Sequence, residues 1–174
     1  MKLDLNIVLY EPEIAGNVGT IIRTCVAANA TLHLIMPFGF ILNSKLIKRT
    51  SSQYINDLKY IVYDDYQDFI AKNPNEIIFY ATRYSYTPHT QIKFCQYSKI
   101  FLMFGKESTG IKKEILGQNL KFCFRIPMAK TVRCLNLACS VAIATYEVLR
   151  QFNYPNLSLE EVQKGKYFLN QFKK

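Results

Sequence analysis

The sequence predicts an α/β protein whose sheet is mostly parallel and carries helices on both faces. Apolar runs of strand length recur along the 174-residue chain, and helical segments fall between several of them. The runs are continuously apolar rather than alternating, which is typical of strands buried on both sides. Strands that alternate with helices favour a parallel sheet whose crossover helices cover both faces.

The expected strands are rich in β-branched and aromatic residues. They span residues 5–10, 31–36, 58–63, 76–82, 99–104 and 121–126. A helix is expected over 18–29, where apolar side chains recur at helical spacing behind Asn17, a polar residue that could cap it. A second helix is expected over 64–72, because its acidic first residues suit a helix start.

The segment 135–152 is apolar almost all round for its first three turns, so it predicts a helix that is buried on every side. Either a second subunit covers one side in a symmetric dimer, or this is a central core helix. Beyond Pro155, segment 157–172 mixes apolar and charged residues and is expected to form a short amphipathic surface helix. We therefore expect one domain over 1–155, with residues 156–174 as its C-terminal tail.

Composition narrows the class of function. A formal charge of +9 and a pI near 9.3 attract polyanions, of which nucleic acid is the commonest, although the charge alone also fits solubility. Five cysteines without a C-x-x-C pair and only two histidines disfavour a zinc site, and no metal is expected. A charged start and short apolar runs predict a cytoplasmic protein without a membrane segment.

Several familiar catalytic motifs are missing from the sequence. It has no G-x-G-x-x-G after the first strand and no G-x-x-x-x-G-K-[ST], which disfavours nucleotide enzymes and ordinary Rossmann methyltransferases. It also has no G-x-S-x-G, H-E-x-x-H or deaminase signature, which disfavours hydrolases and deaminases.

Three segments instead combine glycine, asparagine and arginine at expected strand ends, where open α/β sheets bind ligands. The first holds Asn17, which supplies an amide, and Arg23, which could reach a phosphate or ribose oxygen. A capped helix with a surface arginine is the alternative. In the second, 102–111, Gly105 would let a nucleoside or methionine group lie against backbone, and Glu107 adds a carboxylate. A turn with an internal ion pair is the alternative.

The third segment, 126–137, follows the last expected strand. Pro127 stops strand pairing, so the backbone groups beyond it are free to bind a base edge or a carboxylate. Asn136 opens the apolar helix and needs a polar partner, which a cap, a neighbouring loop or a substrate could supply.

In this order, N-x-G-x-x-x-R, L-M-F-G-x-E-x-x-G-I and I-P-M with L-N-L resemble the three signature motifs of the SPOUT family. Residues 5–14 and 37–40 resemble its minimal single-domain branch, which methylates the 2′-hydroxyl of the wobble pyrimidine, nucleotide 34, of tRNA. The resemblance covers residues 5 to about 155. It implies a deep C-terminal trefoil knot, S-adenosylmethionine as the cofactor, and a homodimer that acts on the anticodon stem-loop of tRNA.

The resemblance also implies roles for particular residues. The expected cofactor-binding residues are Tyr80, Gly105, Ile126, Met128, Cys134 and Leu135; Arg23, Asn17 and Asn136 would face the reacting ribose; and Glu107, Lys130 and Arg133 would bind substrate. Further basic candidates for RNA contact are Lys45, Lys48 and Arg49. Because arginine stays protonated, we expect Arg23 to orient the hydroxyl and a phosphate rather than to act as a base.

The chain departs from the family pattern at three places. Ala15-Gly16 replaces prolines, Cys134 replaces a serine, and Ala138-Cys139 replaces serine-asparagine. The last change removes polar side chains from the expected dimer seam. Two alternatives stay open: a 2′-O-methyltransferase for another tRNA or rRNA site, and a non-catalytic RNA-binding factor with the same fold. The minimal length favours tRNA wobble, since relatives for other sites commonly carry an RNA-binding extension.

Overall fold

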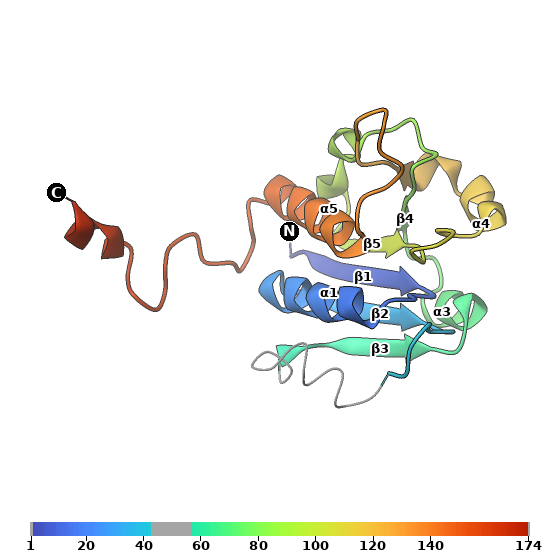
Figure 1. Cartoon of the computed structure of the whole chain (residues 1–174), viewed down its shortest axis with the longest axis horizontal. Coiled ribbons are helices and arrows are strands. Elements are labelled where there is room, and N and C mark those ends of the chain that lie inside the picture. Colours follow the sequence, from blue (N-terminus) through green and yellow to red (C-terminus); the bar gives the residue numbers. More distant parts are fainter. Residues whose placement is uncertain (1, 43–56, 174) are drawn as a thin grey trace.

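A six-stranded parallel sheet organises the chain, whose computed structural model describes residues 2–42 and 57–173 (Figure 1). The strand order is β3-β2-β1-β5-β4-β6. The strands are β1 Asp4–Tyr10, β2 Thr31–Ile35, β3 Tyr60–Tyr63, β4 Ile78–Ala81, β5 Lys99–Phe104 and β6 Cys123–Phe124. Each pair of neighbouring strands in this order is parallel, which confirms the predicted sheet type.

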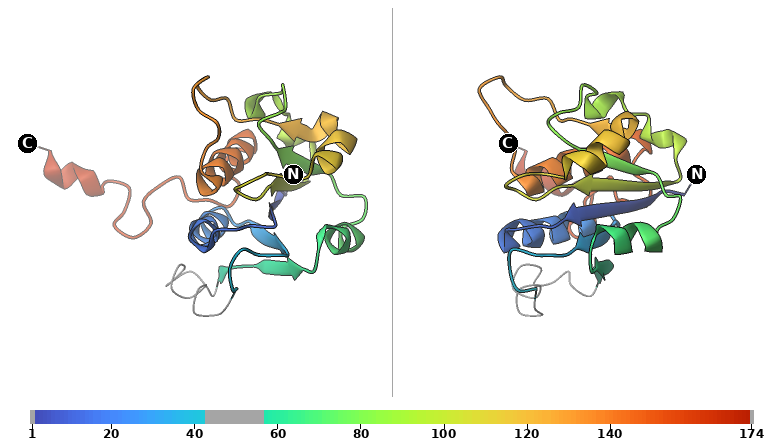
Figure 2. Two further views of the ribbon diagram at one scale, coloured as in Figure 1. Left: turned by 45° about the vertical axis from the view of Figure 1, so that its right-hand side comes forward. Right: turned by 90° about the vertical axis from the view of Figure 1, so that its right-hand side faces the viewer.

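Helices cover both faces of the sheet, as predicted. Helices α1, Ala15–Ala27, and α5, Leu137–Gln151, pack side by side on one face, whereas α3, Tyr66–Lys72, and α4, Lys113–Gln118, lie on the other (Figure 2). The buried residues accordingly form two apolar clusters, one between the sheet and the α1–α5 pair and one between the sheet and α3–α4. Strands β1, β2, β4 and β5 are buried on both sides, which explains their continuous apolar runs, whereas the edge strand β3 exposes Tyr60 and Ile61.

The last strand is shorter than predicted. Only Cys123 and Phe124 pair as a strand, because Leu120–Phe122 forms a 3-10 helix just before them. Beyond them, Arg125 forms an isolated bridge with Pro88. From there the chain leaves the sheet edge and returns to α5 beside α1 (Figure 1). The threading of the trefoil knot stays a prediction.

Of the two predicted helix starts, one is capped as expected and the other is not. Asp65 caps α3, because its carboxylate accepts the Asp68 backbone N–H at 2.8 Å, as the acidic residues indicated. The prediction that Asn17 caps α1 is wrong. Helix α1 already begins at Ala15, its N-cap Ile14 makes no side-chain cap bond, and Asn17 lies inside the first turn.

Helix α5 is capped by Asn136, whose side-chain oxygen accepts the Ala138 and Cys139 N–H groups at 2.8 and 3.3 Å. Of the two alternatives for α5, the central core helix is wrong, because one side of the helix is exposed in the single chain; the dimer alternative stays a prediction. Cys139, Ile143 and Tyr146 follow one side of the helix and are exposed, with Tyr146 at 45%. The other sides pack into the core through residues such as Val141 and Val148.

The predicted amphipathic helix over 157–172 is wrong. The only helical turn of this segment is the 3-10 helix Phe168–Phe172, and the tail extends away from the sheet (Figure 1). Asn156 and Gly165 have positive φ, a conformation that ends helical winding. Most apolar side chains of the tail are exposed, among them Leu159, Val162 and Leu169, so it lacks the packing that normally stabilises a short helix.

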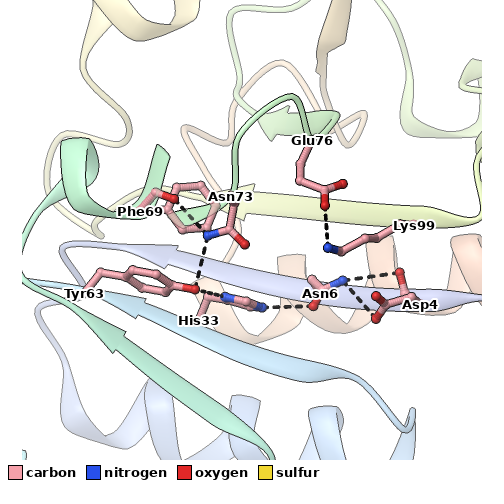
Figure 3. A network of polar contacts seen from close by, with 8 residues as sticks. All are labelled: Asp4, Asn6, His33, Tyr63, Phe69, Asn73, Glu76 and Lys99. Atoms are coloured by element: carbon pink, nitrogen blue, oxygen red, sulfur yellow. Dashed lines mark hydrogen bonds and ion pairs between the residues drawn. The ribbon is translucent and has the colours of Figure 1, made fainter. Parts of the chain in front are cut away.

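A buried polar network crosses the sheet at His33, which is 2% exposed in β2 (Figure 3). Its Nδ1 bonds the Tyr63 hydroxyl at 2.8 Å and its Nε2 bonds Asn6 Oδ1 at 2.9 Å. Burial lowers the pKa of His33 to about 4, so the imidazole is neutral near pH 7. This network satisfies polar groups that would otherwise be costly to bury.

Among the described residues, 2–42 and 57–173, no helix is long and apolar enough to cross a membrane. The predicted RNA contacts at Lys45, Lys48 and Arg49 lie outside these ranges.

Candidate functional site

A cavity of about 590 Å³ opens at the carboxyl ends of β4 and β5. Its walls come from residues 81–84 at the end of β4, residues 104–110 at the end of β5 and the connection that runs from Ile126 to the start of α5. Ile14 and Asn17, at the start of α1, complete it. The three segments singled out in the sequence therefore meet at one place, because the carboxyl ends of parallel strands share one edge of the sheet.

A chain of amide hydrogen bonds joins the three segments. The Asn136 Nδ2 donates to Asn17 Oδ1 at 2.9 Å, and the Asn17 Nδ2 donates to Glu107 Oε1 at 2.7 Å. The Asn136 oxygen is held by the α5 N–H groups that it caps. These contacts fix both amides in orientation.

Glu107 links the loop after β5 to the loop before α1. Its carboxylate accepts the backbone N–H groups of Glu13 at 2.9 Å and Ile14 at 3.3 Å, in addition to the Asn17 amide. It thereby satisfies the N–H group of the N-cap residue Ile14 and that of the residue before it, and so ties the start of α1 to the loop after β5. An internal Lys106–Glu107 ion pair, the alternative from the sequence, does not form; Lys106 pairs with Glu11 at 2.6 Å.

Glu13, in the loop after β1, in turn binds the loop after β5. Its carboxylate accepts the Ser108 backbone N–H at 2.8 Å and the Ser108 hydroxyl at 2.7 Å. These two hydrogen bonds hold the pKa of the Glu13 carboxyl below its usual value. The loop after β1 and the loop after β5 are therefore fastened to each other in both directions, which makes this wall of the cavity rigid.

Gly105 is required by its own loop. A Cβ at this position would lie 2.3 Å from the Gly110 carbonyl carbon and 2.3 Å from the Ile111 nitrogen. The loop turns back on itself here, with the Gly110 N–H bonded to Lys106 O at 2.9 Å and Gly110 at a φ of +75°. The sequence suggested that Gly105 leaves room for a ligand, whereas the closest neighbour in the structure is protein backbone.

Most of the predicted site residues line the cavity. They are Asn17, Gly105, Glu107, Ile126, Met128, Arg133, Cys134, Leu135 and Asn136. Lys130 lies in the wall of a second hollow beside it. Tyr80 and Arg23 are placed elsewhere.

Tyr80 is directed to the opposite face of the sheet. Its ring is buried in the cluster under α3 and α4, and its hydroxyl lies 3.3 Å from that of Tyr66. Burial raises the pKa of Tyr80. We therefore correct the expectation that its side chain lines the cofactor pocket. Arg23 is exposed on α1, six residues or roughly 9 Å of helical rise beyond Asn17.

The cavity wall also includes residues outside the three segments singled out in the sequence. Thr82, Arg83 and Tyr84 follow β4, and Lys113 begins α4. The Arg83 guanidinium lies 4.8 Å from the Tyr84 ring centroid and donates to its hydroxyl at 2.8 Å; this hydrogen bond lowers the pKa of Tyr84. Polar residues directly after a buried parallel strand are a signal that could have indicated this segment.

The cavity has an apolar wall and a polar edge. Ile126, Leu135 and Phe104 form an apolar wall, whereas the fixed amides and nearby cations supply donors at its edge. No group of three or more His, Cys, Asp or Glu side chains that could hold a metal occurs in the described part of the chain. Together these features suit an organic ligand with an apolar body and a few directed polar contacts.

The open parallel sheet, with its cavity at the carboxyl ends of the strands, places this chain in the class of α/β proteins that bind ligands at strand ends. The comparison with known families is more specific. The chain belongs to the SpoU rRNA Methylase family, whose model matches residues 4–146.

Individual relatives match most of this chain. A Geobacillus stearothermophilus protein with the provisional name tRNA (cytidine(34)-2′-O)-methyltransferase is 42% identical over 155 residues, which is 88% of this chain and 99% of the relative. A solved structure described under 2′-OH methylation of C/U34 on tRNA is 35% identical, with a TM-score of 0.80 over 87% of this chain and 97% of that one.

A more distant structure shows that the fold is shared with larger proteins. An S-adenosylmethionine-bound rRNA methyltransferase from Sinorhizobium meliloti is 23% identical, with a TM-score of 0.75 over 86% of this chain and 57% of that chain.

Proposed function

We propose that this protein transfers a methyl group from S-adenosylmethionine to the ribose 2′-hydroxyl of nucleotide 34 in tRNA. The observation that carries the proposal is the hydrogen-bonded chain Asn136–Asn17–Glu107, which brings the three motif segments to one cavity. The chain also matches, over nearly their whole length, relatives whose names and descriptions refer to 2′-O-methylation of nucleotide 34.

The cavity fits the proposed cofactor. Its volume, about 590 Å³, lies in the usual range for small-molecule sites. Ile126, Met128 and Leu135 would contact the apolar parts, while Gly105 and the backbone at Cys134 would form the close wall. S-adenosylmethionine supplies an electrophilic methyl group on a sulfonium centre, so the protein needs no metal for this chemistry.

The main catalytic contribution of the protein would be positioning. An amide nitrogen carries two N–H groups. Asn17 and Asn136 each use one in the hydrogen-bonded chain with Glu107, which leaves a second for an oxygen of the ribose. Holding that oxygen in line with the methyl group converts an encounter into a unimolecular step. Lys130 and Arg133 would contact phosphates, and Glu107 would act by fixing Asn17 rather than by touching the substrate.

The role of Arg23 rests on the family resemblance. Its guanidinium stays protonated at ordinary pH, so we assign it to the orientation of the hydroxyl and an adjacent phosphate. Because Arg23 lies outside the cavity wall of its own chain, this assignment needs either a rearrangement on RNA binding or a site completed by another chain.

We also propose that the protein acts as a homodimer in the cytoplasm. The exposed side of α5, with Cys139, Ile143 and Tyr146, is the surface that supports this proposal. An apolar stripe on a helix is normally covered, and a second copy would cover it through a symmetric contact. Residues 1–155 would form the methyltransferase domain, and 156–174 its tail.

The experiment is transfer of a labelled methyl group to tRNA from cells that lack this protein, followed by nucleoside mapping. Label at the ribose of nucleotide 34 is the expected result. It should fall by roughly a hundredfold in Asn136→Ala, because the amide positions the reacting oxygen. Asn170→Ala, in the exposed tail, is the matched control and should retain full activity.

Three results would contradict the proposal in different ways. Label at another tRNA position or only in rRNA would change the substrate. Binding of S-adenosylmethionine without transfer to any RNA would favour a non-catalytic factor. Full activity in Asn136→Ala would remove the assigned role of that amide.

A further inference from the structure

A second hollow, of about 390 Å³, adjoins the cavity and is strongly basic. Its ionisable residues are Arg83, Arg125, Lys130 and Arg133, and its other wall residues are Met128, Thr131 and Val132. All four charges are positive. The ion pairs found between described residues do not include any of these four side chains.

The floor of this basic hollow is built on paired backbone. Arg83 and Arg125 follow the neighbouring parallel strands β4 and β6. The Ser85 hydroxyl bonds Cys123 O at 2.8 Å, and the Arg125 N–H bonds Thr87 O at 2.9 Å. The backbone beside both arginines is therefore braced, which reduces the backbone ordering that ligand binding would require.

Four like charges around one hollow repel one another in the absence of an anion. A bound anion would remove this repulsion, and the planar forks of two arginines match the oxygens of a phosphate. The hollow shares Arg83, Met128 and Arg133 with the main cavity. A ligand that occupies both places must therefore be extended, with a group in the cavity and an anionic group beside it.

We propose that the basic hollow binds a backbone phosphodiester of the RNA next to the nucleotide whose ribose enters the cavity. The proposal rests on the proposed function, since it assigns to that same substrate a contact outside the reacting ribose. It adds Arg83 and Arg125 to the RNA-binding residues. The competing occupant is the carboxylate of S-adenosylmethionine, which carries a negative charge but is not part of the RNA.

Arg125 and Lys130 allow a sharp test, because they line the hollow but not the cavity. We would measure binding of Arg125→Gln and Lys130→Gln to an anticodon stem-loop RNA over a salt series, with S-adenosylmethionine affinity measured alongside. Each variant should bind RNA roughly tenfold more weakly. The slope of log affinity against log salt should fall by about 0.7–0.9 for each phosphate that the variant no longer neutralises.

Lys121→Gln is the matched control, because this exposed lysine lies just before β6 while Arg125 follows it. It should bind RNA like the wild type, and all three variants should bind S-adenosylmethionine like the wild type. Wild-type RNA affinity and salt slope in Arg125→Gln and Lys130→Gln would overturn the inference. Weakened S-adenosylmethionine binding with RNA affinity unchanged would also overturn it and assign the hollow to the cofactor.

Methyl transfer by the wild-type protein separates this inference from the proposed function. If the wild type methylates nucleotide 34 while both variants bind RNA normally, the inference alone fails. If the wild type transfers no methyl group, the proposed function fails, whatever the RNA affinities of the variants.

Discussion

Gly105→Ala tests the tight turn of the loop after β5. The added Cβ would lie 2.3 Å from the Gly110 carbonyl carbon, whereas two carbon atoms normally pack at about 3.5–4.0 Å. Backbone must therefore move by at least about 1 Å. Because the neighbour is backbone that cannot rotate away, the cost should reach the upper end of overpacking, about 3 kcal/mol.

Gly117→Ala is a matched control, since nothing lies within 4 Å of a Cβ at that position in α4. Alanine is the better helix former, so this change should stabilise the protein by about 0.5–1 kcal/mol. Calorimetry should show a melting temperature roughly 6–12 °C lower for Gly105→Ala and a few degrees higher for Gly117→Ala.

The same pair separates folding from function. Displacement of the 105–110 loop should slow methyl transfer about a hundredfold, measured below the melting temperature. Gly117→Ala should transfer methyl groups at the wild-type rate, because it does not line the cavity. If Gly105→Ala melted and turned over like the wild type, the close backbone approach and its role in shaping the cavity would both be wrong.

Three further predictions concern the core, a helix cap and the loop contact. The pKa of His33 is about 4 in the folded chain against 6.5 ordinarily, so the unfolded chain takes up a proton first as the pH falls and the wild type loses stability. In urea titrations, the difference in free energy of unfolding between the wild type and His33→Gln should narrow by about 3 kcal/mol from pH 7.5 to pH 4. A constant difference would refute the burial of a neutral imidazole. Asp65→Ala should lower the free energy of unfolding by about 1 kcal/mol, and Asp65→Asn should restore most of it. Methyl transfer should be unchanged because no residue of α3 lines the cavity, and lost activity would contradict this placement. Glu107→Gln removes the negative charge that accepts the Glu13 N–H, so it should lower the free energy of unfolding by roughly 2 kcal/mol and slow methyl transfer. Unchanged stability and activity would show that these carboxylate contacts do not organise the cavity.

Local patterns predicted the sheet and most helices correctly because they depend on neighbouring residues. The strand Lys99–Phe104 was predicted with its observed bounds, and Asp65 caps the helix that its acidic neighbours indicated. Asn17 was misassigned because α1 already begins at Ala15, and the Glu13 and Ile14 N–H groups at this helix start bond Glu107, about 90 residues away. A cap supplied across the fold leaves no local signal.

Two other predictions were wrong because the sequence does not show which side chains the fold covers. Both faces of β4 are buried, so its apolar sequence does not reveal which face Tyr80 occupies. The tail has helical periodicity but exposes its apolar side chains, and periodicity alone does not stabilise so short a helix.

By itself, the sequence determined the parallel α/β class, the basic character of the protein and the three segments that carry polar residues at strand ends. These properties follow from composition and short-range periodicity. Only the tertiary structure decided which side chains meet. It joined Asn136, Asn17 and Glu107, directed Tyr80 away from the cavity, and brought Arg83 and Arg125 to one basic hollow. Such contacts link residues far apart in the chain, so they depend on strand order and on which face of each strand is turned toward which helix.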